Sequence, residues 1–174
     1  MRDVSKHLAP CDLEAIKSWI EKVERHKYRP KKLLGKKAHK DLNLTYKMIG
    51  YGKKRIAYDI DNGLVLKIAI TTSGIKNNMT EVEIYQTVSS KLRRHLAKVK
   101  EHGHGWLIMK KLKKEVKRTN RNKSELKRVQ RKFESRGVCP DDLITRKKRV
   151  RWSNIRLDAK RKIIIIDYGN FKFM

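Results

Sequence analysis

Apolar residues near the amino end of the chain recur at helical spacing in the segment PCDLEAIKSWIEKVERH. The recurring positions are Leu13, Ile16, Ile20 and Val23. This spacing predicts an amphipathic helix that begins at Asp12 as its N-cap and packs against another element. The next segment, KYRPKKLLGKKAHK, is basic and is interrupted by Pro30 and Gly35. We expect a loop or arm there, either a solvated linker or a nucleic-acid contact.

From Leu44 onward the pattern changes to short runs that are typical of strands. LTYKMIG, RIAYDI and LVLKIAI are predicted strands, and Asp61-Asn62-Gly63 predicts a hairpin turn between the last two. The segment GYGKK joins the first two strands. Further on, NNMTEVEIYQTVSSKLRRHLAKV predicts a helix, EHGHG a turn and WLIMKKL a fourth strand.

The last third of the chain mixes basic residues with isolated apolar ones. The region from Lys113 to Arg136 is predicted to be helical in its second half, with Ser124 as a cap. The run KKLKKEVKR, which overlaps the start of this region, fits either a basic amphipathic helix for nucleic acid or membrane, or simply a solvated electropositive face. RGVCPDDLI predicts a turn, and NIRLD and KIIIID predict two short strands joined by a hairpin. This alternation of elements indicates an α+β protein.

Charge changes the picture more than any other property of the composition. The 174 residues contain 46 Lys and Arg against 18 Asp and Glu, which gives a formal net charge of +28. Such a charge attracts polyanions, namely nucleic acid, an anionic membrane surface or an acidic protein. We expect a cytoplasmic protein, because the two cysteines lack metal-ligand spacing and the sequence shows no secretory signal. We also expect no membrane insertion, because the sequence has no apolar run of about 20 residues.

Several residues with chemical potential follow one another in a suggestive order. GYGKKRIAY contains Gly50 and Gly52 between two strands, VLKIA carries Lys67 inside the third strand, and NNMTEVEIY places Glu81 in the next helix. Asn154 and Asp167 then lie on the terminal hairpin, where two antiparallel strands would return both to one edge. In this order and spacing the sequence resembles the protein kinase-like fold, especially small atypical bacterial and phage proteins, over about residues 44–173.

The resemblance implies a role for each of these residues. Gly50 and Gly52 would let backbone amides close over the phosphates of ATP, and Lys67 would neutralise phosphate oxygens. Glu81 would pair with Lys67, although Glu83 competes for this role. Asn154 and Asp167, in NIRLD and IIIIDYG, would offer oxygen ligands to Mg²⁺.

The sequence departs from the kinase pattern at the catalytic loop. The position five residues before Asn154, where kinases carry the catalytic aspartate, is Arg149, and arginine cannot act as a base. Asp142 in PDDLI is the nearest candidate, but it lies twelve residues before Asn154 (154 − 142 = 12). If Asp142 is the base, the basic insertion between it and Asn154 must bulge out; otherwise Asp142 caps the next turn.

Together these features predict a truncated kinase-like fold. Residues 1–43 would form an amino-terminal helix and basic arm, 44–112 a small antiparallel-sheet lobe with a helix, and 113–174 a reduced second lobe ending at the DFG-like motif. Only five residues follow Asp167-Tyr168-Gly169, so we expect little structure to position a substrate.

The preferred hypothesis is a catalytically impaired kinase-like protein of phage or bacterial origin that binds a nucleic acid or nucleoprotein complex and regulates or inhibits it. ATP and Mg²⁺ are candidate cofactors. The expected polyanion contacts are Lys31, Lys32, Lys36, Lys37, Arg146, Lys147, Lys148, Arg149 and Arg151. One alternative is an active minimal Mg-ATP-dependent kinase with Asp142 as base. Another is a basic adaptor or inhibitor that binds an acidic protein surface.

Overall fold

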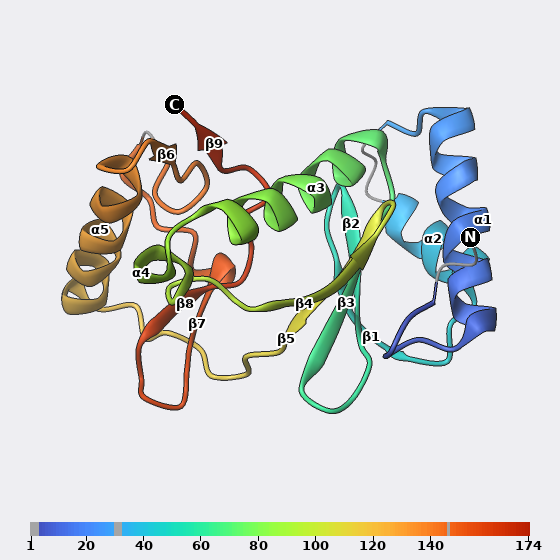
Figure 1. Cartoon of the computed structure of the whole chain (residues 1–174), viewed down its shortest axis with the longest axis horizontal. Coiled ribbons are helices and arrows are strands. Elements are labelled where there is room, and N and C mark those ends of the chain that lie inside the picture. Colours follow the sequence, from blue (N-terminus) through green and yellow to red (C-terminus); the bar gives the residue numbers. More distant parts are fainter. Residues whose placement is uncertain (1–3, 30–32, 146) are drawn as a thin grey trace. The chain divides into compact units, whose positions relative to one another are not determined.

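The computed structural model describes residues 4–29, 33–145 and 147–174, and the chain divides into two compact units (Figure 1). The first unit is Met1–Met79 with Val99–Lys111, and the second is Thr80–Lys98 with Leu112–Met174. Within the described residues, none of the helices combines the length and the apolar character that crossing a bilayer requires.

A five-stranded antiparallel sheet is the centre of the first unit. Its strands are β1 (Lys47–Tyr51), β2 (Arg55–Asp59), β3 (Leu64–Ala69), β4 (Val99–Gly103) and β5 (Trp106–Lys110). They are ordered β1-β2-β3-β5-β4, and the predicted turn at Asp61–Gly63 joins β2 to β3. The four predicted strands are confirmed, and the turn expected at EHGHG lies at its last two residues, His104 and Gly105. The first three residues of that segment belong to β4, an edge strand with no buried residue and therefore no alternation of apolar and polar positions.

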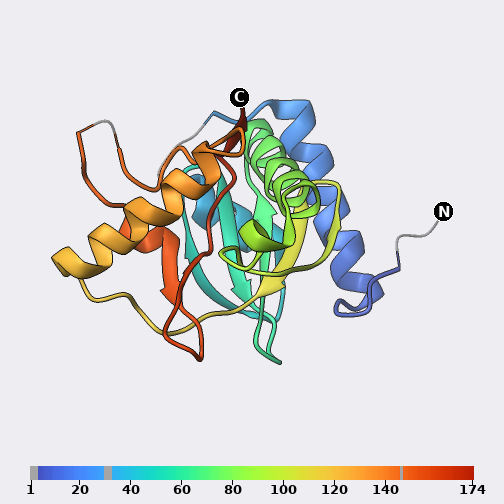
Figure 2. The same ribbon diagram turned by 60° about the vertical axis from the view of Figure 1, so that its left-hand side comes forward.

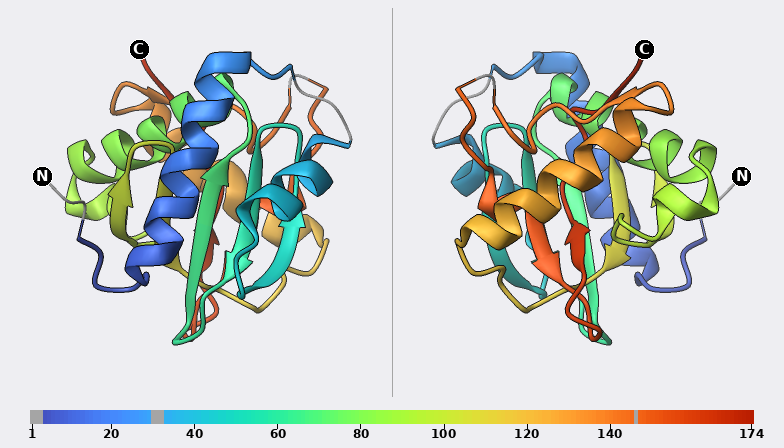
Figure 3. Two further views of the ribbon diagram at one scale, coloured as in Figure 1. Left: turned by 90° about the vertical axis from the view of Figure 1, so that its right-hand side faces the viewer. Right: turned by 90° about the vertical axis from the view of Figure 1, so that its left-hand side faces the viewer.

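The first unit has one core, between the sheet and two helices that lie on the same side of it (Figure 3). Alternate residues of β2 and β3 point into this core, as their period-2 pattern requires. They meet the buried stripe of α1 (Pro10–His26), whose Trp19 Nε1 donates a 2.9 Å hydrogen bond to the backbone carbonyl of Ala69. The opposite face of β3 carries Lys67, which is half-buried.

Two expectations about the amino-terminal elements were wrong. The N-cap of α1 is Ala9, with Pro10 at the first helical position, while Asp12 lies in the first turn and accepts a 2.6 Å hydrogen bond from Tyr46 Oη. The segment expected to be a loop contains a second helix, α2 (Leu34–Leu42). Gly35 does not interrupt this helix because it is buried beneath the ring of Tyr51, where a Cβ would lie 2.1 Å from Cδ2 of the ring.

Helix α3 (Thr72–Thr87) begins five residues earlier than the apolar pattern suggested. Thr71 explains the start, because its buried Oγ1 accepts a 3.0 Å hydrogen bond from the backbone amide of Gly74. The predicted single helix is also interrupted. A separate short helix, α4 (Ser90–Arg93), follows α3 after Val88 and Ser89.

The described residues of the second unit include the second half of α3, the short α4, one longer helix and two small two-stranded sheets (Figure 2). Helix α5 (Asn120–Glu134) begins at Thr119, whose side chain accepts from the amide of Asn122, so Ser124 is an interior residue and not the cap. The segment KKLKKEVKR, for which a helix was considered, precedes α5 and is not helical. Strands β6 (Val138–Cys139) and β9 (Lys172–Phe173) pair with each other and were not foreseen.

The predicted carboxy-terminal hairpin is confirmed. Strands β7 (Ile155–Leu157) and β8 (Ile163–Ile165) pair antiparallel, with Ile155 opposite Ile165, and all three residues of β8 are buried. The backbone amide of Ile165 donates to the carbonyl of His95, and that of Ala97 donates back to Ile165. Aromatic packing completes this core, since Phe133 of α5 meets Phe171 edge-on with ring centroids 5.5 Å apart.

Candidate functional site

The first group of predicted site residues lies in a row across the sheet of the first unit. Register pairs Gly50 with Ala57, Ala57 with Lys67, and Lys67 with Leu107. These four residues, the glycine–lysine row, therefore belong to the same face of β1, β2, β3 and β5. With strands about 4.8 Å apart, Gly50 and Lys67 are separated by two strand spacings, or about 10 Å.

Gly50 and Gly52 are glycines without a structural requirement in the fold. An ideal Cβ built on either residue meets no heavy atom within 4 Å, and neither has a positive φ. Gly74 is different, because its Cβ would lie 2.1 Å from the carbonyl oxygen of Lys54. Packing thus explains Gly74 but not Gly50 and Gly52, where an added Cβ would meet open space. A phosphate group could approach the backbone there without obstruction.

The second group of residues lies in the second unit, at one end of the β7–β8 hairpin. The backbone amide of Ile166 donates a 2.8 Å hydrogen bond to the carbonyl of Asn154, which places Asn154 and Asp167 at the same edge. Asn154 Nδ2 in turn donates to the backbone carbonyl of Asp142 at 3.1 Å. Asp142, Asn154 and Asp167 are referred to below as the acidic corner.

Asp142 is held by side chains rather than by its own turn. Its carboxylate accepts a hydrogen bond from Asn170 Nδ2 and lies 3.7 Å from the guanidinium of Arg151. Its backbone has φ of +71°, the left-handed region, which Asp adopts more readily than most residues. A carboxylate has about four lone-pair sites, so these two contacts leave it able to accept a further hydrogen bond. Asn170 was not among the expected site residues; its position directly after Asp167-Tyr168-Gly169 was the only available signal.

The insertion between Asp142 and Asn154 forms a closed hairpin. The amide of Arg151 donates to the carbonyl of Leu143 at 2.9 Å, and Ile144 and Val150 form an antiparallel bridge. The amide of Thr145 donates to the carbonyl of Arg149 at 2.9 Å. The insertion therefore leaves and returns at the same point, and Arg149 lies on it rather than beside Asn154. If Asp142 is the base, the insertion between it and Asn154 has to bulge out, and the hairpin does so.

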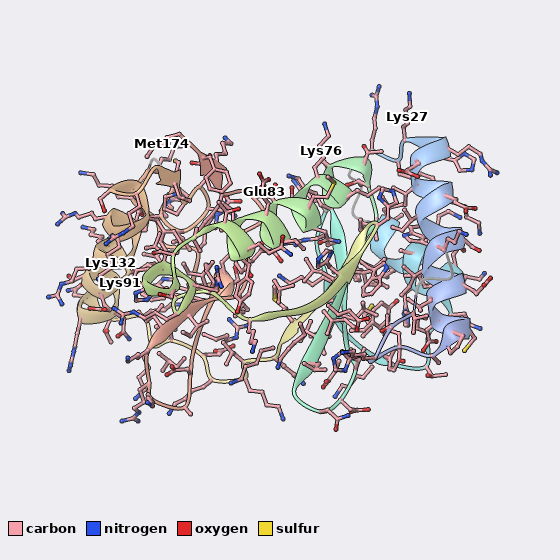
Figure 4. The ribbon with its side chains drawn as sticks, in the orientation of Figure 1. Lys27, Lys76, Glu83, Lys91, Lys132 and Met174 are labelled. Atoms are coloured by element: carbon pink, nitrogen blue, oxygen red, sulfur yellow. The ribbon has the colours of Figure 1, made fainter. Side chains whose placement is uncertain are left out.

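Glu81 is tied to the segment that contains Asp167. It is fully buried on α3, and its Oε1 accepts a 3.0 Å hydrogen bond from the backbone amide of Tyr168. The competing candidate, Glu83, is exposed on the same helix (Figure 4). Burial and this contact distinguish Glu81 from Glu83; the pairing of Glu81 with Lys67 stays a prediction.

The expected polyanion contacts are divided among separate elements. Lys36 and Lys37 are exposed on α2, where Lys37 also pairs with Asp41 at 3.3 Å. The exposed cations of the inserted hairpin are Lys147, Lys148, Arg149 and Arg151. Lys31, Lys32 and Arg146 lie outside the residues that the structure describes.

Comparison with solved structures indicates a kinase-like fold. Two structures of WbdD, one titled a bifunctional kinase-methyltransferase and one a complex with a kinase inhibitor, match with TM-scores of 0.54 and 20% identity, over 70% and 71% of this chain. A third WbdD structure matches with a TM-score of 0.52 and 22% identity over 70% of this chain. The chain spans only 31% to 32% of the length of these structures. No protein-family model and no curated protein matches the sequence.

Proposed function

We propose that this protein is a Mg-nucleotide-dependent phosphotransferase of the kinase-like class, with Asp142 as its catalytic base. One observation carries the proposal: the side chain of Asn154 donates its hydrogen bond to the backbone carbonyl of Asp142 at 3.1 Å. This contact joins the proposed base to a proposed metal ligand despite the twelve-residue separation. The hypothesis of impaired catalysis rested on the net charge of +28, the basic insertion, the short segment after Gly169 and Arg149 in the position of the base; the closed hairpin bears on the last of these, because it places Arg149 on the insertion.

The donor atoms of the acidic corner suit magnesium. Among the described residues, no group of three or more His, Cys, Asp or Glu side chains is placed to hold a metal ion. Mg²⁺ commonly takes only one or two protein carboxylates and completes its coordination with substrate phosphates and water. Asp167 and Asn154 would supply the protein's share of oxygen ligands, and bound Mg²⁺ would neutralise charge that develops on the phosphoryl oxygens.

The remaining roles belong to the chain's own groups. The Asp142 carboxylate would accept the proton of the attacking hydroxyl, with Asn170 and Arg151 fixing its orientation. Gly50 and Gly52 would admit the phosphates to the backbone, and Lys67 would offset their charge.

The test is transfer of the γ-phosphate from labelled ATP, with Mg²⁺, to water, to the protein itself and to cell-lysate acceptors. Asp142→Asn should lower the rate by about 10²–10⁴-fold, the usual contribution of a general base, while leaving nucleotide binding intact. Asp167→Asn should weaken Mg-dependent nucleotide binding itself. Asp141→Asn is the matched control, since Asp141 is the adjacent acid and instead bonds Lys172 at 2.8 Å. Transfer that persists in both Asp142→Asn and Asp167→Asn would refute the proposal.

A second candidate function is binding of a nucleic acid or nucleoprotein complex and its regulation. The supporting observation is the net charge of +28 together with exposed Lys147, Lys148 and Arg149 on the hairpin that follows Asp142. Purification at low salt without nuclease should then yield a complex with nucleic acid that dissociates steeply as salt rises. Nucleic-acid-free protein under those conditions would remove this candidate and leave the first intact.

A further inference from the structure

A second basic surface lies outside the glycine–lysine row, the acidic corner and the expected polyanion contacts. It begins with residues 113–119, an extended strap between β5 and α5. The strap is anchored because its Lys114 carbonyl accepts a 2.8 Å hydrogen bond from the amide of Leu157 and its Val116 is buried. The carbonyl of Lys117 accepts from Asn122 Nδ2 at 2.8 Å, which joins the strap to the first turn of α5. Strap and helix thus form one ordered element.

The outward side of α5 continues this basic surface. Leu126, Val129 and Phe133 form the buried stripe, and the residues on the opposite side of the helix are exposed. The exposed side carries Arg121, Lys127, Arg128 and Arg131. Figure 4 shows side chains ending in nitrogen projecting from this helix.

The two acids of α5 do not cancel this charge. Glu125 and Glu134 are only half-exposed, and they flank the outward side rather than lying on it. Glu125 is engaged by Arg128 at 3.3 Å and Glu134 by Gln130 at 2.8 Å. The outward side is therefore a row of cations directed at solvent.

We propose that this strap–α5 face binds the phosphate backbone of duplex DNA without reading its sequence; the inference rests on the second candidate function and assigns it a surface. The residues of the face are Lys114, Lys117, Arg118, Arg121, Lys127 and Arg131. At a rise of about 1.5 Å per residue, Arg121 and Arg131 lie about 15 Å apart along the helix. A row of this length suits a periodic polyanion better than a single acidic side chain.

Two features select the duplex over other nucleic acids. The outward side of α5 presents no aromatic side chain, and stacking on aromatics is how proteins commonly hold single strands. An α-helix fits the major groove of B-form DNA, which is about 12 Å wide, but not the narrow major groove of A-form RNA. The cations of the helix would then contact the phosphates that border the groove.

The test compares three triple variants of the full chain, each with the same loss of charge. The first is Arg121→Gln, Lys127→Gln and Arg131→Gln on α5. The second is Lys147→Gln, Lys148→Gln and Arg149→Gln on the inserted hairpin. The third, on the exposed side of α1, is Lys17→Gln, Lys22→Gln and Arg25→Gln, and it controls for net charge. Affinity for a mixed-sequence DNA duplex is measured from low to high salt, and thermal unfolding verifies that each variant is folded.

The α5 variant should bind duplex DNA about a hundredfold more weakly at 0.15 M salt, and the slope of log affinity against log salt should fall by about 2.7, or about 0.9 for each lost contact. The α1 variant should behave like the wild type. An α5 variant no weaker than the α1 variant overturns the inference. Loss in the hairpin variant alone overturns it too, but leaves the second candidate function standing. The inference is also overturned if the wild type does not bind DNA, or if it binds heparin or single strands as tightly as duplex DNA. The phosphate-transfer assay tests the first proposed function independently of this result.

Discussion

Replacing Gly50 and Gly52 by alanine should separate the stability of the protein from its binding of nucleotide. Gly50 lies near the end of β1 and Gly52 directly after it, each with open space where a Cβ would be. Glycine at such positions lowers stability, because the unfolded chain has more conformations to lose. If Gly50 and Gly52 serve only the fold, alanine would stabilise the protein more at both positions. If they admit phosphate groups to the backbone, glycine is required there for nucleotide binding.

The magnitude follows from the local geometry. The new Cβ atoms meet no heavy atom within 4 Å, and φ is not positive at either residue, so no steric or conformational penalty is expected. Reduced unfolded-state entropy should stabilise the protein by about 0.4–1 kcal/mol per substitution. For a chain of this size, the double variant should then melt about 2–8 °C higher than the wild type. Nucleotide affinity should nevertheless fall by about tenfold or more, since a Cβ would stand where a phosphate approaches the backbone.

Gly74→Ala is the matched control for this experiment. Its Cβ would lie 2.1 Å from the carbonyl oxygen of Lys54, a backbone atom that cannot move cheaply. Such overpacking costs about 1–3 kcal/mol, so the variant should melt at a lower temperature. Thermal unfolding and equilibrium binding of Mg-ATP are measured on all variants. The reasoning fails if Gly50→Ala and Gly52→Ala destabilise the protein as Gly74→Ala does, or if nucleotide affinity is unchanged.

Three further experiments test the second unit. Burial, and then the positive charge of Lys132, lower the pKa of His95 from 6.5, so the unfolded state takes up protons that the folded state does not. The free energy of unfolding, from urea titrations, should fall as pH drops below 6.5, and His95→Gln should remove this dependence. Glu81→Ala leaves the buried amide of Tyr168 without its acceptor and should cost about 1–3 kcal/mol in the same titration, whereas Glu81→Gln should cost less. Deleting residues 144–150 should preserve folding and Asp142-dependent phosphate transfer, because the ends of the excised hairpin already meet at a 2.9 Å hydrogen bond.

Much of the first unit follows from local pattern. Strands β2 and β3 alternate buried and less buried residues along their length, and that period fixes which face each residue occupies. The position of Lys67 opposite Ala57, on the face away from the core, is a consequence of this alternation and of the tight turn at Asp61–Gly63. The run of isoleucines in β8 was equally informative, because a short run of β-branched residues favours a buried strand over a helix.

Other elements lacked a usable pattern. Strand β4 pairs with one neighbour only and buries none of its residues, so polar side chains occupy both of its faces. Helix α2 is short and lysine-rich, and its Gly35 has the appearance of a breaker until the ring of Tyr51 is seen to cover it. The contact of Asn170 with Asp142 joins positions far apart in the sequence, and no local propensity encodes such a contact.

The segment from Asp142 to Asn154 shows why counting residues along the chain is a poor guide to which side chains lie near Asn154. The number of residues between a base and a metal ligand predicts their distance in space only when the intervening segment has no insertion and keeps the same conformation. Here the intervening chain closes on itself at Leu143 and Arg151, so the hairpin adds residues without moving its ends apart. The position five before Asn154 holds Arg149 on the hairpin, whereas the hydrogen bond from the Asn154 side chain to the Asp142 carbonyl shows directly that Asp142 and Asn154 are neighbours. Under the two proposed functions, the basic residues of the hairpin would bind a polyanion and Asp142, where the hairpin begins, would accept a proton. The hairpin keeps its other described cations away from Asp142, and among the cations that the structure describes there only Arg151 pairs with that carboxylate.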